Sequence, residues 1–173
     1  MAAADGPETA ARRVDADGVG SIRERVRGTN INEKSLLATD YLNHFNEIVM
    51  VLGLIPDMPD CLEDAKAWCP KSYTDHFRDS GFSDSELAIA AYDHAPPDYR
   101  EMFDGTVEHM DRLVALSIDR ISAAPAIGER DAIERATSRA TRDLKWLMDV
   151  ASAIIRGTKP TISQDEIDDL LDG

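Results

Sequence analysis

Two long segments with an apolar side chain at every third or fourth position constrain the fold of this chain most. The first runs from about residue 98 to 123, and the second runs from about residue 129 to 156. This spacing places the apolar side chains on one face of an α-helix. Between the segments lie Pro125 and Gly128, which favour a short turn, so the sequence predicts two long antiparallel helices. The predicted buried faces consist of Phe103, Val107, Met110, Val114, Ile118 and Ile121, and of Ile133, Ala136, Ala140, Leu144, Leu147, Ala151 and Ile154.

A third helix is predicted upstream, from Asn32 to about Leu54. Asn32 is a favoured N-cap residue, and Pro56 ends the segment. Its apolar face is formed by Leu37, Tyr41, Ile48, Leu52 and Ile55, with His44 or Phe45 filling the gap.

Shorter helices should connect this third helix to the long pair. We expect them near residues 61–69 and 71–79, separated by Pro70, and from a capping box at Ser83 and Glu86 to about residue 94. No segment alternates with a period of two for long enough to suggest a strand. The sequence therefore predicts an all-α protein, an antiparallel helical bundle with short accessory helices.

Composition sets the boundaries of the bundle. Residues 1–31 mix Ala, Gly, Asp and Arg without periodicity, which is typical of a flexible, disordered arm. Residues 32–157 form the predicted bundle domain, and Gly157 stands where a C-terminal cap is expected. Residues 158–173 contain a linker and a terminal amphipathic segment.

Charge and composition exclude several classes of function. The formal net charge is −14, which disfavours nucleic acids and anionic membranes as partners. No apolar run reaches the roughly 18 residues of a membrane span. The N-terminal residues lack the apolar core of a signal peptide, and Cys61 and Cys69 have neither redox-motif nor zinc-ribbon spacing. These features predict a reduced, cytoplasmic protein.

The terminal segment carries the most specific pattern in the chain. Ser163 and Glu166 have the spacing of a capping box, and Ile162 and Ile167 have the spacing of a hydrophobic staple. Ile167, Leu170 and Leu171 then share one face of a short helix that is otherwise acidic. A helix of this length is marginal alone in water, so we expect it to be completed by a partner surface.

Residues 163–171, with the sequence SQDEIDDLL, resemble the N-terminal peptide of the flagellar motor switch protein FliM. Residues 168–172 are also similar to the C-terminal docking helix of the CheZ phosphatases. Both resemblances imply a phosphorylated CheY-type response regulator as the partner. The implied binding residues are Ser163, Gln164, Asp165, Glu166, Ile167, Asp168, Leu170 and Leu171. The alternative is that the helix folds back on its own domain, its acidic first turn stabilised by the helix dipole.

An enzymatic alternative rests on the first predicted long helix. Asp40 and Asn43 are three residues apart, similar to the Glu-x-x-Asn pattern of CheC/CheX phosphatases with a shorter acid. That resemblance implies that Asn43 would orient the attacking water and that Asp40 would pair with the regulator's lysine. The simpler hypothesis is an adaptor or sink that only binds the regulator, without catalytic residues of its own.

The sequence also bears on three further classes of function: a metal site, a histidine phosphotransfer domain and a small-molecule sensor. The four histidines lie beside polar or acidic residues, but no Glu-x-x-His motif of a di-iron bundle occurs, so we expect no metal and no cofactor. Neither His44 nor His109 has the neighbours typical of a histidine phosphotransfer domain. The aromatic segment from Trp68 to Phe82 could instead line the pocket of a small-molecule sensor.

Overall fold

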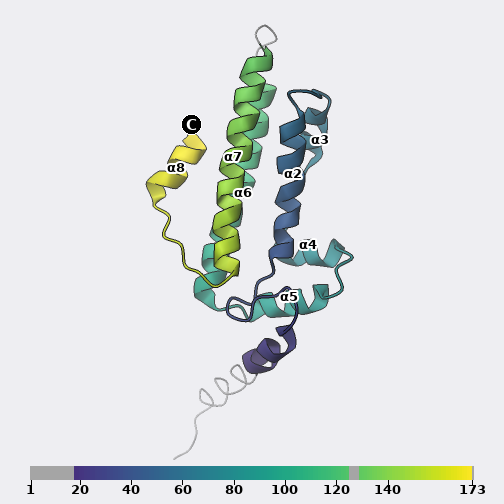
Figure 1. Cartoon of the computed structure of the whole chain (residues 1–173), viewed down its shortest axis with the longest axis vertical. Helices are drawn as coiled ribbons and strands as arrows, with labels where there is room; N and C mark the ends of the chain where they lie inside the picture. Colours follow the sequence, from purple (N-terminus) through teal and green to yellow (C-terminus); the bar gives the residue numbers. More distant parts are fainter. Residues whose placement is uncertain (1–17, 125–128, 173) are drawn as a thin grey trace, which may run out of the picture.

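A computed structural model describes residues 18–124 and 129–172 of the chain. Residues 18–26 are helical, and the elements that follow are labelled as in Figure 1. They are η1 (Thr39–Leu42), α2 (Asn43–Leu54), α3 (Cys61–Ala67), α4 (Tyr73–Asp79), α5 (Ser85–Asp93), α6 (Pro97–Ser122), α7 (Glu129–Ile155) and α8 (Gln164–Asp172). The described residues contain no strand, only an isolated bridge between Ile31 and Ala38, so the predicted all-α class is confirmed.

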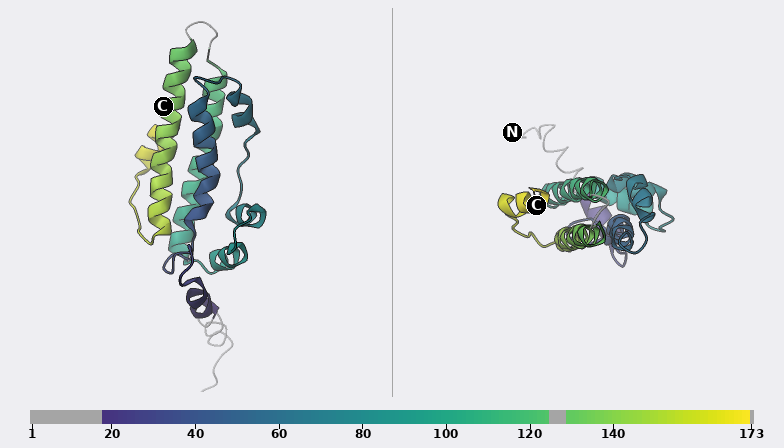
Figure 2. Two further views of the ribbon diagram at one scale, coloured as in Figure 1. Left: turned by 45° about the vertical axis from the view of Figure 1, so that its right-hand side comes forward. Right: turned by 90° about the horizontal axis from the view of Figure 1, so that it is seen from above.

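The bundle is built on the antiparallel pair of α6 and α7, with α2 packed beside α7 (Figures 1 and 2). These helices contribute half of the buried apolar side chains of the described residues, including Phe45, Phe103, Met110 and Leu144. Pro97 occupies the first position of α6, as its missing N–H and fixed φ favour. The predicted stripes of α6 and α7 therefore face a shared core.

The predicted flexible arm extends too far along the chain. Residues 18–26 form a helix whose Ile22 and Val26 are buried against the rest of the core. The spacing of Val19, Ile22 and Val26 is helical, but three apolar side chains in a short segment rich in Gly and Arg were too weak a pattern to distinguish it from a polar arm. Residues 1–17, the rest of that prediction, lie outside the described residues.

The predicted start of the first long helix at Asn32 is wrong. The Asn32 side chain accepts hydrogen bonds from the backbone N–H groups of Lys34 and Ser35, as an N-cap would. The chain then turns through Leu36 at a positive φ of 59° and enters the 3-10 helix η1 only at Thr39. Asn32 thus closes a tight turn, because its side chain can bond to nearby backbone in turns as well as in helices.

This N-terminal loop is held by the carboxyl end of α7. The Ser35 hydroxyl donates to the carbonyl of Ile155, and Lys34 Nζ donates to the carbonyl of Gly157 at 2.7 Å. The Tyr99 hydroxyl donates to the same Gly157 carbonyl at 2.9 Å. Gly157 has a φ of 84° and donates to Ile154, while Thr158 donates to Ala153, so the predicted C-terminal cap is formed.

The accessory helices lie close to their predicted positions. Pro70 separates α3 from α4, and the Ser72 hydroxyl caps α4 by accepting from the Asp75 N–H at 3.1 Å. The capping box predicted at Ser83 and Glu86 is wrong, because α5 begins at Ser85. The Ser85 hydroxyl instead donates to the carbonyl of Phe82 at 2.6 Å.

The terminal helix α8 lies against α6 on the side of the α6–α7 pair opposite to α2 (Figure 2, view from above). A linker returns from the Gly157 cap to reach it. The Lys159 ammonium group binds Asp98 of α6 at 2.6 Å and lies over the Tyr99 ring, which attaches the linker to the start of α6.

Candidate functional site

The predicted capping box of the terminal helix is present. The backbone N–H of Glu166 donates to the Ser163 hydroxyl at 3.2 Å, and the backbone N–H of Ser163 donates to the Glu166 carboxylate at 2.9 Å. The Ser163 hydroxyl also donates to the Glu166 carboxylate, at 2.9 Å. The hydrogen bonds that the carboxylate accepts, first the one from the Ser163 backbone and then the one from the Ser163 hydroxyl, lower the pKa of Glu166. The spacing of Ser163 and Glu166 therefore predicted the start of this helix correctly.

The apolar face of α8 is turned toward the bundle. Leu171 is only 6 % exposed, while Ile167 and Leu170 are half-buried and packed on the core together with Ile162 of the linker. Four of the other predicted binding residues, Ser163, Asp165, Glu166 and Asp168, are exposed, and the side chain of Gln164 lies outside the described ones. The bundle thus covers Ile167, Leu170 and Leu171, the three apolar side chains that were predicted to bind a partner.

Two arginines of the bundle bind the carboxyl end of α8. Arg120 of α6 donates to the Leu171 carbonyl at 2.7 Å, and Arg139 of α7 donates to the Asp169 carbonyl at 3.4 Å. The last carbonyls of a helix have no partner within the helix and carry partial negative charge. Because α8 has no basic residue in its own last turn, these arginines supply the cap from outside.

Arg139 is itself held in place by a buried carboxylate. Asp143, 4 % exposed, lies 3.5 Å from Arg139 Nε and 2.9 Å from Arg142 Nε. Two guanidinium groups compensate the cost of burying this charge. Arg139 therefore connects Asp143 of the bundle to the backbone of α8.

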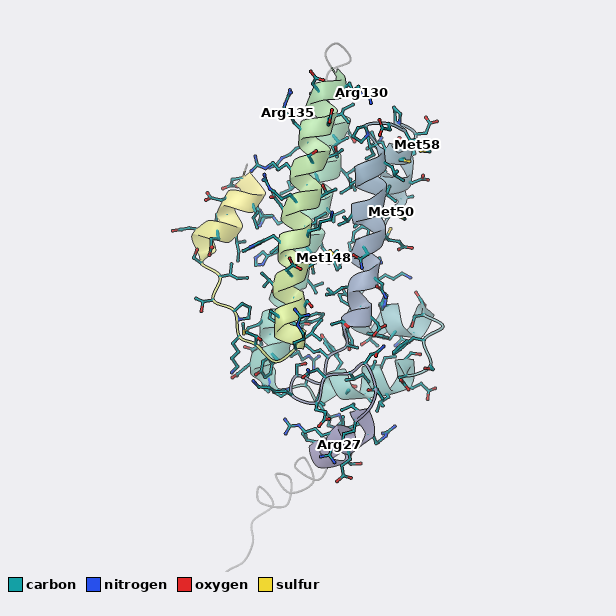
Figure 3. All side chains as sticks on the ribbon, viewed as in Figure 1. Arg27, Met50, Met58, Arg130, Arg135 and Met148 are labelled. Atoms are coloured by element: carbon teal, nitrogen blue, oxygen red, sulfur yellow. The ribbon has the colours of Figure 1, made fainter. Side chains whose placement is uncertain are left out.

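A groove between α6 and α7 runs along this side of the bundle; we call it the α6–α7 groove. Its lower part is a pocket of about 190 Å³. Residues of α6 and α7 line one side of this pocket, and Pro160, Ile162 and Ile167 line the other. Its upper part, about 220 Å³, lies between α6 and α7 and is bordered by Arg120, Arg135 and Arg139. Arg135 projects from the upper part of α7 (Figure 3).

Sequence reasoning did not identify Arg120 and Arg139 as partners of the terminal helix. Each lies 30 or more residues from its carbonyl partner, at separations of 51 and 30 residues. Nothing in the local sequence of residues 163–172 indicates which side chains bind the carboxyl end of the helix.

The two predicted catalytic residues are placed in different surroundings. Asn43 is exposed at the start of α2, where it accepts a hydrogen bond from Asn46 at 3.5 Å. Asp40 is half-buried in η1, and its Oδ2 atom is buried without a hydrogen-bond partner among the described residues. The acid that accompanies Asn43 at the surface is Glu47, and both line an open pocket of about 410 Å³.

Two histidines border the same pocket. The His44 ring is 6 % exposed, stacks on Trp68 at 4.6 Å and lies 6.1 Å from the His76 ring. Burial is the main cause that lowers the pKa of both imidazoles, so both are neutral near pH 7. Within the described ranges, no three His, Cys, Asp or Glu side chains are arranged to hold a metal ion.

The aromatic segment proposed for a sensor pocket packs into the core. Tyr73 and Phe77 are buried, with ring centroids 4.7 Å apart, and Tyr73 also contacts Phe103 and Tyr92. The Tyr73 hydroxyl accepts a hydrogen bond from the Ala38 N–H at 2.8 Å. Cys61 is buried and Cys69 exposed, and both are free thiols.

Comparisons of the chain with protein-family models, with curated proteins and with solved structures gave no match. Among the described helices, none has both the length and the apolar composition required to cross a membrane. The candidate site therefore depends on the chain's own residues: the terminal helix, the arginines that bind it, and the polar pocket at Asn43.

Proposed function

We propose that this protein binds a phosphorylated CheY-type response regulator through residues 163–171, as an adaptor or sink. The proposal combines the resemblance of this segment to the FliM peptide with one structural observation, the capping box between Ser163 and Glu166. A capped helix reaches the partner with part of its ordering cost already met, and such preorganisation increases affinity. Ile167, Leu170 and Leu171 supply the apolar anchors, and the acids guide the approach.

The test measures binding of the full chain to a CheY-type regulator of the source organism by titration calorimetry. The regulator is used in phosphorylated and unphosphorylated form. We expect the phosphorylated form to bind more tightly, and Leu170→Ala to weaken binding by about 1–3 kcal/mol, the scale for a buried aliphatic side chain.

The matched control is Asp172→Asn, an exposed change at the end of the same helix. It removes one charge without removing apolar surface, so its effect should be a few tenths of a kcal/mol and should decrease with salt. Equal binding of both regulator forms, or an unchanged affinity of Leu170→Ala, refutes the proposal.

The second candidate is a phosphatase of the same regulator. It is favoured by the exposure of Asn43, since an amide that positions water must reach the regulator's active site. It is weakened by the half-buried position of Asp40, so Glu47 is the better candidate for the acid.

The discriminating assay is the rate of regulator dephosphorylation with and without the full chain. A phosphatase gives an acceleration that Asn43→Ala abolishes while tail binding persists; an adaptor leaves the rate unchanged. Asn46→Ala is the matched control, because it removes a second exposed amide from the same helix. We expect no acceleration.

A further inference from the structure

The α6–α7 groove binds the same face of α8 that the proposed function assigns to the regulator. Leu171 is buried against the bundle and its carbonyl binds Arg120 at the upper part of the groove, while Ile167 lines the lower part. A short helix cannot present one apolar face to two surfaces at once. We infer that the α6–α7 groove is an internal docking site for α8 that competes with the regulator, so that the chain alternates between a closed and an open tail. This inference rests on the proposed function.

The polar contacts of the groove suit an acidic helix. The chain carries a net charge of −14, yet the upper part of the groove is bordered by Arg120, Arg135 and Arg139 and by one acidic residue, Asp143. The α8 helix contributes five acidic residues and no basic one. Local charge at the groove is therefore complementary to the tail, although the rest of the chain would repel it.

The arginines also bind the tail in a way that depends on its helical state. Arg120 and Arg139 donate to backbone carbonyls in the last turn of α8, at 2.7 and 3.4 Å. The last carbonyls of a helix have no partner within the helix, so they are free to accept hydrogen bonds from the arginines only when α8 is helical and ends there. The groove thus recognises the capped helix as such, as well as its apolar side chains.

The connection allows release without unfolding the bundle. The linker is fixed at its start by the Gly157 cap and by Lys159 bound to Asp98. Of the described apolar side chains of α8, Leu171 is buried and two others are half-buried, whereas α6 buries six. Such a segment opens at a lower free energy than the core helices do.

The consequence is a regulated affinity. If only a fraction of the chains has an open tail, the apparent dissociation constant for the regulator rises by the inverse of that fraction. Loss of the Arg120 hydrogen bond should shift the closing equilibrium by about tenfold, the scale of one charge-assisted hydrogen bond. Arg120→Ala should therefore bind the regulator about tenfold more tightly than the wild-type chain.

Two measurements on the full chain test this inference. The first is hydrogen exchange of the α8 amides without the regulator. We expect exchange slower than the random-coil rate in the wild type, and about tenfold faster exchange in Arg120→Ala and Arg139→Ala. Arg130→Ala is the matched control, because Arg130 lies on the same helix as Arg139 but pairs with Asp57 and makes none of the α8 contacts named above.

The second measurement is the affinity of the same four chains for the phosphorylated regulator. Tighter binding by Arg120→Ala and Arg139→Ala, with Arg130→Ala unchanged, supports competition. Wild-type α8 amides that exchange at the random-coil rate overturn the inference, as do equal regulator affinities of wild type and Arg120→Ala. If neither the wild type nor the opened variants bind the regulator, the proposed function itself has failed, and the exchange rates alone report whether the tail closes.

Discussion

Gly157→Ala should destabilise the bundle more than the same change at another glycine with a positive φ. Gly157 has a φ of +84°, and an added Cβ would lie 2.6 Å from Lys34 Cδ and 3.2 Å from Lys34 Cβ and Cγ. Lys34 cannot simply rotate away, because its ammonium group donates to the Gly157 carbonyl at 2.7 Å. The change therefore strains the backbone and displaces a hydrogen-bonded side chain at the junction from which the tail departs.

The magnitude follows from two contributions. A left-handed backbone costs an L-residue with a Cβ about 1–2 kcal/mol. Displacing Lys34 weakens a hydrogen bond of a charged group, which we set at about 1–2 kcal/mol because Lys34 is exposed. The sum is about 2–4 kcal/mol. Gly28→Ala is the matched control: Gly28 has a φ of +77° with nothing within 4 Å of an added Cβ, so it carries only the first contribution.

Urea unfolding followed by circular dichroism at 222 nm measures the difference. With a slope of about 2 kcal/mol per molar urea, Gly157→Ala should unfold at a midpoint about 0.5–1 M below that of Gly28→Ala. In a Lys34→Ala background, most of this excess should vanish, since the nearest atom is then removed. Equal midpoints for the two glycine variants, or an excess that survives Lys34→Ala, would refute the steric argument.

Three further changes test the core and its charges by the same unfolding assay. Leu144→Ala should cost about 2–5 kcal/mol, because Leu144 is fully buried between helices, and a loss below 1 kcal/mol would contradict its place in the core. Gly105→Ala should stabilise by about 0.5–1 kcal/mol, because α6 offers open space around an added Cβ; destabilisation would show a hidden contact. Burial, with the Glu108 charge adding, raises the pKa of Asp111 to about 6, so its stabilising protonated form is present below pH 4 and is lost as the pH rises through 6. Asp111→Asn should therefore flatten the decrease in stability between pH 4 and 7, and an unchanged pH profile would contradict the raised pKa.

The long helices were predictable because local pattern and tertiary packing agree there. The stripe from Phe103 to Ile121 is periodic over many turns, and most of its members are buried in the structure. Val107 and Ile118 are only half-buried, while Leu113, absent from the predicted stripe, is buried. The face is wider than one narrow stripe because α6 contacts α3 and α7 as well as α8.

The start of the bundle could not be predicted, because its hydrogen bonds are nonlocal. Ser35 is fully buried, and its hydroxyl binds the Ile155 carbonyl, which is 120 residues away in the chain. A sequence pattern shows Asn32 as a good helix cap, but it does not show that the carboxyl end of α7 will accept the next hydroxyl. Tertiary bonds thus converted an expected helix start into a tight turn with Leu36 at a positive φ.

For the candidate site, the terminal helix could be predicted from the sequence, but the surface that it packs against could not. The capping box and the apolar face of α8 come from residues within two turns of each other, so local rules were sufficient. The arginines that bind its carboxyl end lie on α6 and α7, and no local sequence pattern distinguishes them from other arginines of those helices. A marginal helix needs a second surface, and the chain provides one in the α6–α7 groove. If the proposed regulator binds the same face of α8, it must compete with that groove, and Arg120 and Arg139 then influence its affinity without touching it.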